Sequence, residues 1–183
     1  MPRLILINGA PGSGKSTLAR RYADEHPLTL NLDVDVVRGL LGAWLDQPTD
    51  AGRLARRLAL AMARTHLEQG CDVVVPQFLG RLEFLDALDA LAAEVGAAFV
   101  EVALLSDAAD VTRRFAERSA RRETNQHRDA SALLNRSGGP ATLLEFHDQL
   151  RAVVAARPRT RSVRSVDGRL EQTYRDLLSA IDR

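Results

Sequence analysis

Residues Leu4 to Thr17 read LILINGAPGSGKST, and this stretch decides the fold. Four consecutive apolar residues lead into Asn8, and the eight residues from Gly9 to Ser16 fit the pattern G-x-x-x-x-G-K-[ST]. A buried strand that runs directly into such a loop, with a helix after it, is the context of a phosphate-binding loop. The stretch therefore predicts a strand, a loop that binds a nucleoside triphosphate, and a helix.

Each part of this loop has a chemical role. Glycines let the backbone wrap a phosphate chain at φ angles closed to other residues, and amides at the N-terminus of the next helix face the phosphate oxygens. We expect the Lys15 ammonium to reach the β- and γ-phosphates and the Ser16 hydroxyl to bind Mg²⁺. The expected nucleotide-binding residues are Gly9, Ala10, Pro11, Gly12, Ser13, Gly14, Lys15, Ser16 and Thr17.

The choice of basic residues supports this interpretation. The chain has 25 lysines and arginines, and Lys15 is the only lysine among them. Genomic base composition accounts for the general preference for arginine. A single lysine inside this motif indicates that the loop needs a compact ammonium there and not a planar guanidinium.

Length and composition describe an ordinary globular domain. At 183 residues the chain is expected to form a single domain over residues 1–183. The net charge of +1 favours neither nucleic acid nor a membrane surface. One cysteine, Cys71, excludes an internal disulfide and a zinc site built on several cysteines. With no signal-like segment and no long apolar run, we expect a cytoplasmic protein.

Apolar runs and alternation predict five strands with helices between them. The expected strands are 3–8, 28–33, 72–76, 98–105 and 161–166, and the expected helices are 15–25, 34–45, 51–69, 81–95, 107–120, 140–155 and 170–181. Strands that alternate with helices indicate an α/β domain with a parallel sheet. The fold class that follows is a three-layer P-loop nucleoside-triphosphate hydrolase fold with a five-stranded parallel sheet.

Two absent motifs narrow the class of P-loop protein. A GTPase usually reads guanine with N-K-x-D, which a chain with no second lysine cannot contain. A motor ATPase usually ends a strand in a carboxylate, but Val73-Val74-Val75 runs into Pro76-Gln77. The acid after the next strand, Asp107, has the position of a helix cap. A small kinase remains.

Two aspartates after the second strand are the candidates for the chemistry of a kinase. Ligands of a doubly wound sheet collect beyond the carboxyl ends of its strands, and acids at i and i+2 face one side if the strand persists. Phosphoryl transfer requires a group that orients the nucleophile. We expect Asp35 to be the general base and Asp33 a ligand of Mg²⁺ or substrate, unless one only caps a helix. Arg38, one turn on, would hold an anionic substrate or lie on a solvated face.

The run GAPGSGKSTLARRYADEHP followed by LDVDVVR resembles the N-terminal part of polynucleotide 5′-kinases. It is similar as well to the chloramphenicol phosphotransferase and zeta-toxin group of small P-loop kinases. The resemblance covers about Leu4 to Arg38. It implies that Asp35 accepts the proton of the acceptor hydroxyl, and that Asp35 and Arg38 match a D-x-x-R motif whose arginine contacts substrate phosphate. Asp33 adds a D-x-D pattern also seen in shikimate kinases, where the first acid lies near the metal.

The rest of the chain is expected to supply a lid and an acceptor site. Residues 111–122 and the polar segment 119–139 resemble the arginine-bearing lids of adenylate-kinase-like folds, which close over ATP. Arg118 and Arg122 are the expected γ-phosphate ligands, since a guanidinium donates in a bidentate way. By the same resemblance the loop 165–168 would touch the adenine. Residues 34–70 are expected to form acceptor-binding helices, and the candidates for lining that site are Trp44, Gln77 and Arg81. Core packing is the alternative for Trp44.

Three hypotheses follow. The first is an ATP- and Mg²⁺-dependent kinase that phosphorylates a hydroxyl of a metabolite or antibiotic, with Asp35, Lys15, Arg118 and Arg122 as catalytic residues. The second is a polynucleotide 5′-hydroxyl kinase, which the D-x-x-R motif and the arginine-rich stretches support. Against it, only 4% of the residues are aromatic, and no aromatic platform on which bases could stack is visible. The third is a non-catalytic ATP-binding regulator, which would have no need of the two aspartates. The acceptor and the oligomeric state stay open.

Overall fold

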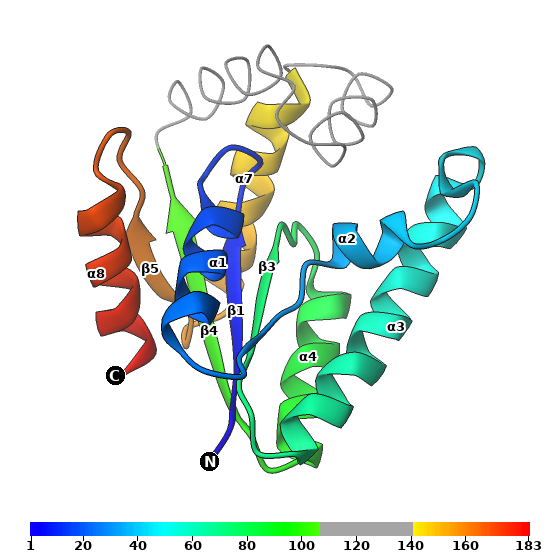
Figure 1. The fold of residues 1–183 in the computed structure, drawn as a ribbon. Coiled ribbons are helices and arrows are strands. Elements are labelled where there is room, and N and C mark those ends of the chain that lie inside the picture. Colours follow the sequence, from blue (N-terminus) through cyan, green and yellow to red (C-terminus); the bar gives the residue numbers. More distant parts are fainter. Residues whose placement is uncertain (107–140) are drawn as a thin grey trace. The chain divides into compact units, whose positions relative to one another are not determined.

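The computed structural model describes residues 1–106 and 141–183. The segment 119–139 that was expected to form a lid, with Arg118 and Arg122, lies outside the described residues. Among the residues described, no helix is both long and apolar enough to cross a membrane. The elements, labelled in Figure 1, are β1 Arg3–Gly9, α1 Lys15–Glu25, β2 Leu30–Asn31, α2 Val34–Gly39, the 3₁₀ helix η1 Trp44–Asp46, α3 Pro48–Glu68, β3 Val73–Gln77, α4 Leu82–Glu94, β4 Ala98–Leu105, α7 Ala141–Ala156, β5 Arg161–Arg164 and α8 Leu170–Ile181.

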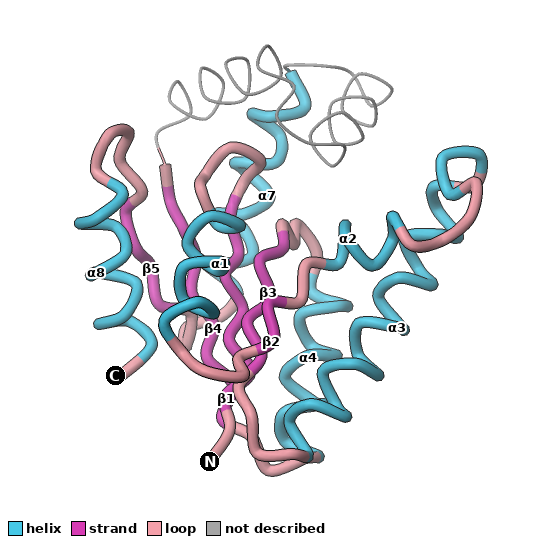
Figure 2. The backbone as a smooth tube through the Cα atoms, in the orientation of Figure 1, coloured by secondary structure: helices cyan, strands magenta, loops and turns pink. Residues whose placement is uncertain are grey.

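The five strands form one sheet in the order β2-β3-β1-β4-β5, drawn in magenta in Figure 2. β2 pairs with β3 in parallel, with Leu30 opposite Val73. β4 pairs with β5 in parallel, from Val102 opposite Arg161 to Leu105 opposite Arg164. The expected five-stranded parallel sheet is therefore confirmed.

The described chain forms two compact units. The first comprises residues 1–7, 16–77 and 81–101. In it, α3 contacts α2, α4 and β3, and α3 and α4 run side by side (Figure 1). Its fully buried side chains come from β1, α1, β3 and α4 and include Leu4, Ile5, Leu6, Ile7, Leu18, Val73, Val74, Val75, Leu85 and Leu88.

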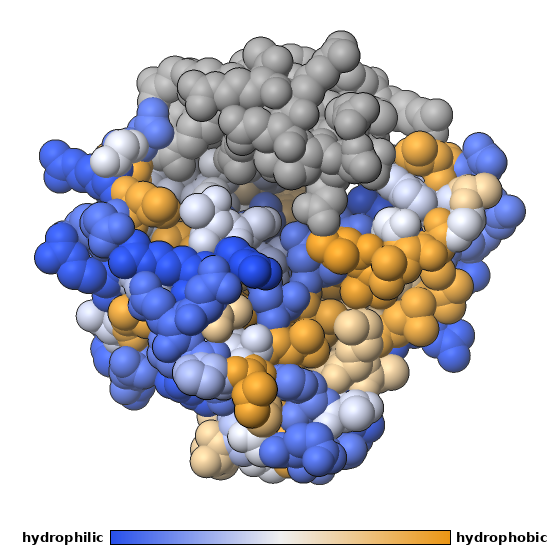
Figure 3. Space-filling model, in the orientation of Figure 1, coloured by the Kyte–Doolittle hydropathy of each residue, from blue (hydrophilic) through white to orange (hydrophobic). Residues whose placement is uncertain are grey.

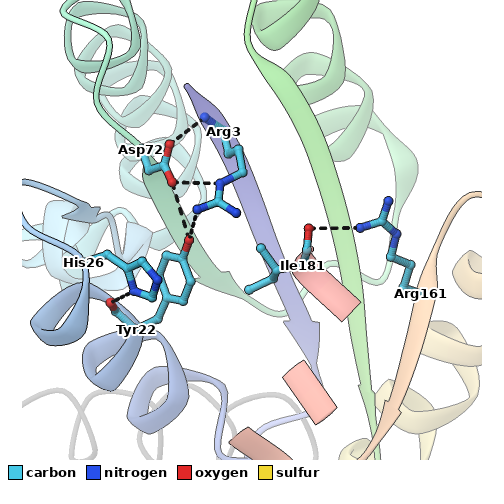
Figure 4. Close-up of polar contacts among 6 residues, drawn as sticks. All are labelled: Arg3, Tyr22, His26, Asp72, Arg161 and Ile181. Atoms are coloured by element: carbon cyan, nitrogen blue, oxygen red, sulfur yellow. Dashed lines mark hydrogen bonds and ion pairs between the residues drawn. The ribbon is translucent and has the colours of Figure 1, made fainter. Parts of the chain in front are cut away.

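A polar network in this unit joins the beginnings of β1 and β3 to α1 (Figure 4). The backbone amide and Nε of Arg3 donate to the Asp72 carboxylate at 2.8 and 2.9 Å. Nη2 of Arg3 donates to the buried hydroxyl of Tyr22 at 2.8 Å, and the Tyr22 ring stacks on His26 at 3.9 Å. Each of these groups has a partner within the unit, which is the arrangement of a structural brace.

The second unit comprises residues 8–15 and 78–80 together with the chain from Val102 onward. α8 packs on β5. Arg161 at the start of β5 donates to the carbonyl oxygens of Ala180 and Ile181 at the end of α8, and Figure 4 shows the contact with Ile181. A cation at these carbonyls complements the negative end of the helix dipole.

Two sequence expectations are wrong in their boundaries. The helix expected over 34–45 ends at Gly39 and is followed by a turn and η1, because two glycines interrupt it and Ala43 takes a left-handed φ of 50°. The second strand was expected to reach Asp33 but ends at Asn31. Asp33 instead caps α2, with its side chain accepting a hydrogen bond from the Asp35 amide. The other described elements lie within a few residues of their expected bounds.

Candidate functional site

The loop between β1 and α1 has the backbone that its glycines predict. Gly12 and Gly14 have φ angles of 93° and 91°, which side chains strongly disfavour. The amide of Ser13 donates to the carbonyl oxygen of Ala10 at 3.0 Å and closes a tight turn between them. The loop therefore adopts a conformation that depends on glycine at two positions.

Ser13, in the middle of this loop, is anchored by contacts with other residues of the second unit. It is buried, and its carbonyl oxygen accepts a hydrogen bond from the Ser165 hydroxyl at 2.9 Å. A Cβ atom on Gly9 would collide with the Ser13 hydroxyl and lie 3.3 Å from Cβ of Leu104. The loop that begins at Ser165 thus braces the phosphate-binding loop, while its expected contact with adenine stays a prediction.

Asn8 fixes the other side of the same loop, a role that the sequence analysis missed. It is buried and exchanges two hydrogen bonds with the backbone of Leu79. Next to Leu79, the Phe78 ring lies 4.7 Å from that of Phe146 on α7. A polar residue at the end of an apolar strand is the only sequence signal for this contact, since its partner is 71 positions away.

The first turn of α1 supplies the remaining groups of the phosphate-binding motif. Lys15 is half-buried, and the hydroxyl residues Ser16 and Thr17 are exposed. The first turn of α1 carries no acidic residue. Its amides therefore keep the positive character that binds an anion at a helix N-terminus.

Asp33 serves first as a helix cap. Its backbone is extended, with φ −82° and ψ 115°, and its Oδ1 accepts a hydrogen bond from the Asp35 amide at 2.9 Å. Because the strand ends before it, the expectation that both aspartates face one side of a continuing strand is wrong. Asp35 lies in the first turn of α2 instead.

Asp35, Arg38 and Trp44 come together in the first unit. Nη2 of Arg38 lies 3.0 Å from Oδ1 of Asp35, and the Asp35 side chain is 45% exposed. The Arg38 guanidinium carbon lies 4.6 Å from the centre of the Trp44 ring. Trp44 is half-buried, so it does not lie inside an apolar core, and its expected place in the acceptor site stays a prediction. This contact holds the guanidinium beside a carboxylate that remains open to solvent.

Several polar atoms near these elements are buried without a hydrogen-bond partner among the described residues. In the first unit they are Nε of Arg38, Oε1 of Gln77 at the end of β3, and Oδ1 of Asn31 on β2. A buried polar group without a partner costs about 1–3 kcal/mol, so a ligand or water that satisfies these atoms would bind favourably. Arg81, the other expected substrate residue, is exposed just before α4.

The donor set fits Mg²⁺ held jointly with a nucleotide. Among residues 1–106 and 141–183, no group of three or more histidine, cysteine, aspartate or glutamate residues could hold a metal by itself. Mg²⁺ prefers oxygen ligands and usually binds to phosphates, water and one or two protein oxygens. The exposed Ser16 hydroxyl is such an oxygen. Asp33 already uses one carboxylate oxygen in capping α2.

Comparison with known proteins places the chain among P-loop domains. The sequence pattern of a family described as an AAA domain matches residues 4–137. Among curated proteins, none matches the sequence significantly.

Solved structures with the same fold include a candidate kinase from Chloroflexus aurantiacus, which is 15% identical with a TM-score of 0.68, covering 99% of this chain and 96% of that one. A gluconokinase from Sinorhizobium meliloti is 19% identical with a TM-score of 0.62, covering 100% and 93%. A tunicamycin resistance protein from Deinococcus radiodurans is 16% identical with a TM-score of 0.63, covering 99% and 96%. At these identities the likeness concerns the fold, and it confirms the expected α/β P-loop fold of the adenylate-kinase-like type.

Proposed function

The chain belongs to the AAA_33 family of AAA domains, and from this premise we propose that it is an ATP- and Mg²⁺-dependent small-molecule kinase. It transfers the γ-phosphate of ATP to a hydroxyl group. The observation that carries the proposal is the Asp35–Arg38 ion pair beside Trp44. A domain that only binds a nucleotide has no need of a solvent-open carboxylate whose position is fixed by an arginine.

The nucleotide side of the reaction rests on the phosphate-binding motif. Amides around Gly12 to Ser16 bind the phosphate chain, and the Lys15 ammonium binds the β- and γ-phosphate oxygens. Ser16 would hold Mg²⁺, which would supply positive charge to neutralise these oxygens, and Asp33 would be a ligand of a Mg²⁺-bound water or of the substrate. Arg118 and Arg122 lie outside the described residues. The resemblance to arginine-bearing lids implies that their guanidinium groups bind the γ-phosphate and neutralise its remaining charge.

Asp35 performs the proton transfer on the acceptor side. As the acceptor oxygen forms its bond to the γ-phosphorus, the bond to the bridging oxygen of ADP breaks, and the hydroxyl proton moves to the Asp35 carboxylate. The ion pair with Arg38 engages Oδ1, so Oδ2 is the oxygen that takes the proton. Arg38 also has its Nε to offer to an acceptor oxygen, and Gln77 offers Oε1 to an acceptor hydroxyl or amide.

Separate measurements of nucleotide binding and turnover test this assignment. We expect Lys15→Ala to weaken ATP binding, whereas Asp35→Asn leaves ATP binding intact and abolishes phosphate transfer. Asp46→Asn is the matched control, because Asp46 is an exposed aspartate in η1 of the same unit. The acceptor panel should contain sugar acids, sugars, nucleosides and antibiotics. Gluconate and tunicamycin belong in it, because proteins that share the fold are named for them.

The two alternatives make different predictions in the same assays. A polynucleotide kinase would label an oligonucleotide that carries a 5′-hydroxyl, and no labelling would exclude it. A non-catalytic regulator would bind ATP with no phosphorylated product from any pool of metabolites, and a partner would be recovered with it. Full activity of Asp35→Asn on an acceptor would contradict the mechanism proposed here.

A further inference from the structure

Between Ala51 and Ala63, helix α3 buries a row of alanines, while three larger apolar side chains of the same stretch are exposed. Ala51, Ala55, Ala59 and Ala63 are between 0% and 7% exposed. The apolar residues directly before three of them, Leu54, Leu58 and Met62, are between 40% and 45% exposed. Residues four apart lie above one another on a helix, so the exposed residues form a continuous stripe. Burial of apolar surface is the main source of stability, and this stretch of the helix leaves three large apolar side chains partly exposed to water.

The stripe continues onto the neighbouring elements. Val36 on α2, Leu40 directly after α2 and Leu45 in η1 are between 36% and 77% exposed, and α2 and η1 both contact α3. Figure 3 shows a broad hydrophobic area on the side of the molecule where Figure 1 labels α2 and α3. We define the apolar face by its residues Val36, Leu40, Leu45, Leu54, Leu58 and Met62. A contiguous apolar area of this kind marks a binding surface far more often than scattered leucines do.

The apolar face adjoins the residues proposed to act on the acceptor. On α2, Asp35 directly precedes Val36, and Arg38 lies two residues before Leu40. Trp44 directly precedes Leu45. One short segment therefore carries the proposed base, a guanidinium and large exposed apolar groups. A molecule that presents its hydroxyl to Asp35 has apolar surface within reach along the same elements.

We propose that the acceptor is amphipathic, with its hydroxyl at Asp35, a polar group at Arg38 and an apolar body on the apolar face. This inference rests on the proposed function, because it concerns the acceptor of the same site. The continuity of the face with Asp35 and Arg38 supports this occupant. A second copy of the chain fits less well, since the exposed Arg57 lies beside the stripe and a symmetric contact would bring two such like charges together.

A homologous series of primary alcohols, from butanol to octanol, tests the proposal without the natural acceptor. The alcohols displace 8-anilinonaphthalene-1-sulfonate, a fluorescent apolar anion, from the protein. We expect the displacing concentration to fall about fourfold for each added methylene. In a Leu54→Gln/Leu58→Gln variant this dependence should weaken, and Met62→Gln should weaken it independently. Leu170→Gln is the control, because Leu170 is 44% exposed on α8 in the other unit.

The possible results of these experiments distinguish failure of the amphipathic-acceptor proposal from failure of the kinase proposal. Displacement that does not depend on chain length, or that Leu54→Gln/Leu58→Gln leaves unchanged, overturns the inference. So does a dimer that the double variant dissociates, or binding to phosphatidylcholine–phosphatidylglycerol vesicles that the double variant loses. The readout needs no phosphate transfer, so Lys15→Ala should keep the chain-length dependence. An acceptor that proves to be wholly polar would overturn the inference and leave the kinase assignment standing.

Discussion

The Asn8 side chain forms two hydrogen bonds with the backbone of Leu79: its Nδ2 donates to the carbonyl oxygen at 3.1 Å and its Oδ1 accepts from the amide at 2.9 Å. Both groups of Leu79 lie in the protein interior. The contact ties the strand that enters the phosphate-binding loop to the segment that follows β3. A loop with positive φ angles needs such contacts with the surrounding structure to keep a single backbone conformation.

Replacement of Asn8 by alanine should therefore weaken the fold and the nucleotide site together. It leaves the amide and carbonyl of Leu79 buried without partners, which costs about 3 kcal/mol of unfolding free energy for the two groups. Urea denaturation measures that loss, and equilibrium binding of an ATP analogue to the folded fraction should weaken as well. Unchanged stability would mean that water replaces both hydrogen bonds.

Two Gly→Ala variants should shift stability in opposite directions. In Gly9→Ala the new methyl displaces the Ser13 hydroxyl and lies only 3.2 and 3.3 Å from Cβ of Ser13 and of Leu104, so we expect a loss of stability and of ATP affinity. In Gly52→Ala the methyl on α3 meets nothing within 4 Å, so helix propensity alone should stabilise by about 1 kcal/mol. Thermal unfolding of the pair checks the prediction, and a loss at both positions would contradict it.

The emission of Trp44 should report on Arg38. Trp44 is the only tryptophan, and the Arg38 guanidinium carbon lies 4.6 Å from its ring centre. Arg38→Ala uncovers that ring face and removes a contact worth about 1 kcal/mol, so the emission maximum should move to longer wavelength. Arg38→Lys, which keeps the charge without the planar group, should show a smaller shift. An identical spectrum for Arg38→Ala would show that the stacking does not persist in solution.

The network around Arg3 should matter for stability and not for chemistry. Asp72→Ala leaves the Arg3 amide and guanidinium without their carboxylate, and we expect a loss of about 2–3 kcal/mol in unfolding free energy. Tyr22→Phe removes only the hydroxyl contacts and should cost about 1 kcal/mol. ATP affinity per folded molecule should stay unchanged in both, and a selective loss of ATP binding would contradict the structural role.

The sequence predicted the fold well because its signals are local. The phosphate-binding motif and the apolar runs mark five strands, and each of them is present. The segment from Asp33 to Trp44 was predicted less well. Its alternating pattern suggested a longer strand, and its apolar content suggested a longer helix. A capping aspartate and the glycines at 39 and 42 override both patterns, since turn chemistry competes with periodicity over short stretches.

The parts of the site that depend on distant residues could not be predicted. The partners of Asn8 and Ser13 are Leu79 and Ser165, which lie far along the chain. On α3, alanines and large apolar residues both recur every four positions, so the sequence does not say which stripe faces the core. Only the packing of α3 against its neighbours reveals that Leu54, Leu58 and Met62 are exposed and the alanines beside them buried.

Mass-spectrometric detection of a phosphorylated product tests directly whether the protein is a small-molecule kinase with Asp35 as its base. The wild-type protein, Lys15→Ala and Asp35→Asn are each incubated with ATP, Mg²⁺ and the acceptor panel, and ATP binding is measured in parallel. We expect a phosphorylated small molecule, formed only with Mg²⁺, from the wild type alone, while Asp35→Asn still binds ATP. A product formed by Asp35→Asn at the wild-type rate, or ATP bound by the wild type with no product from any acceptor, would contradict this expectation.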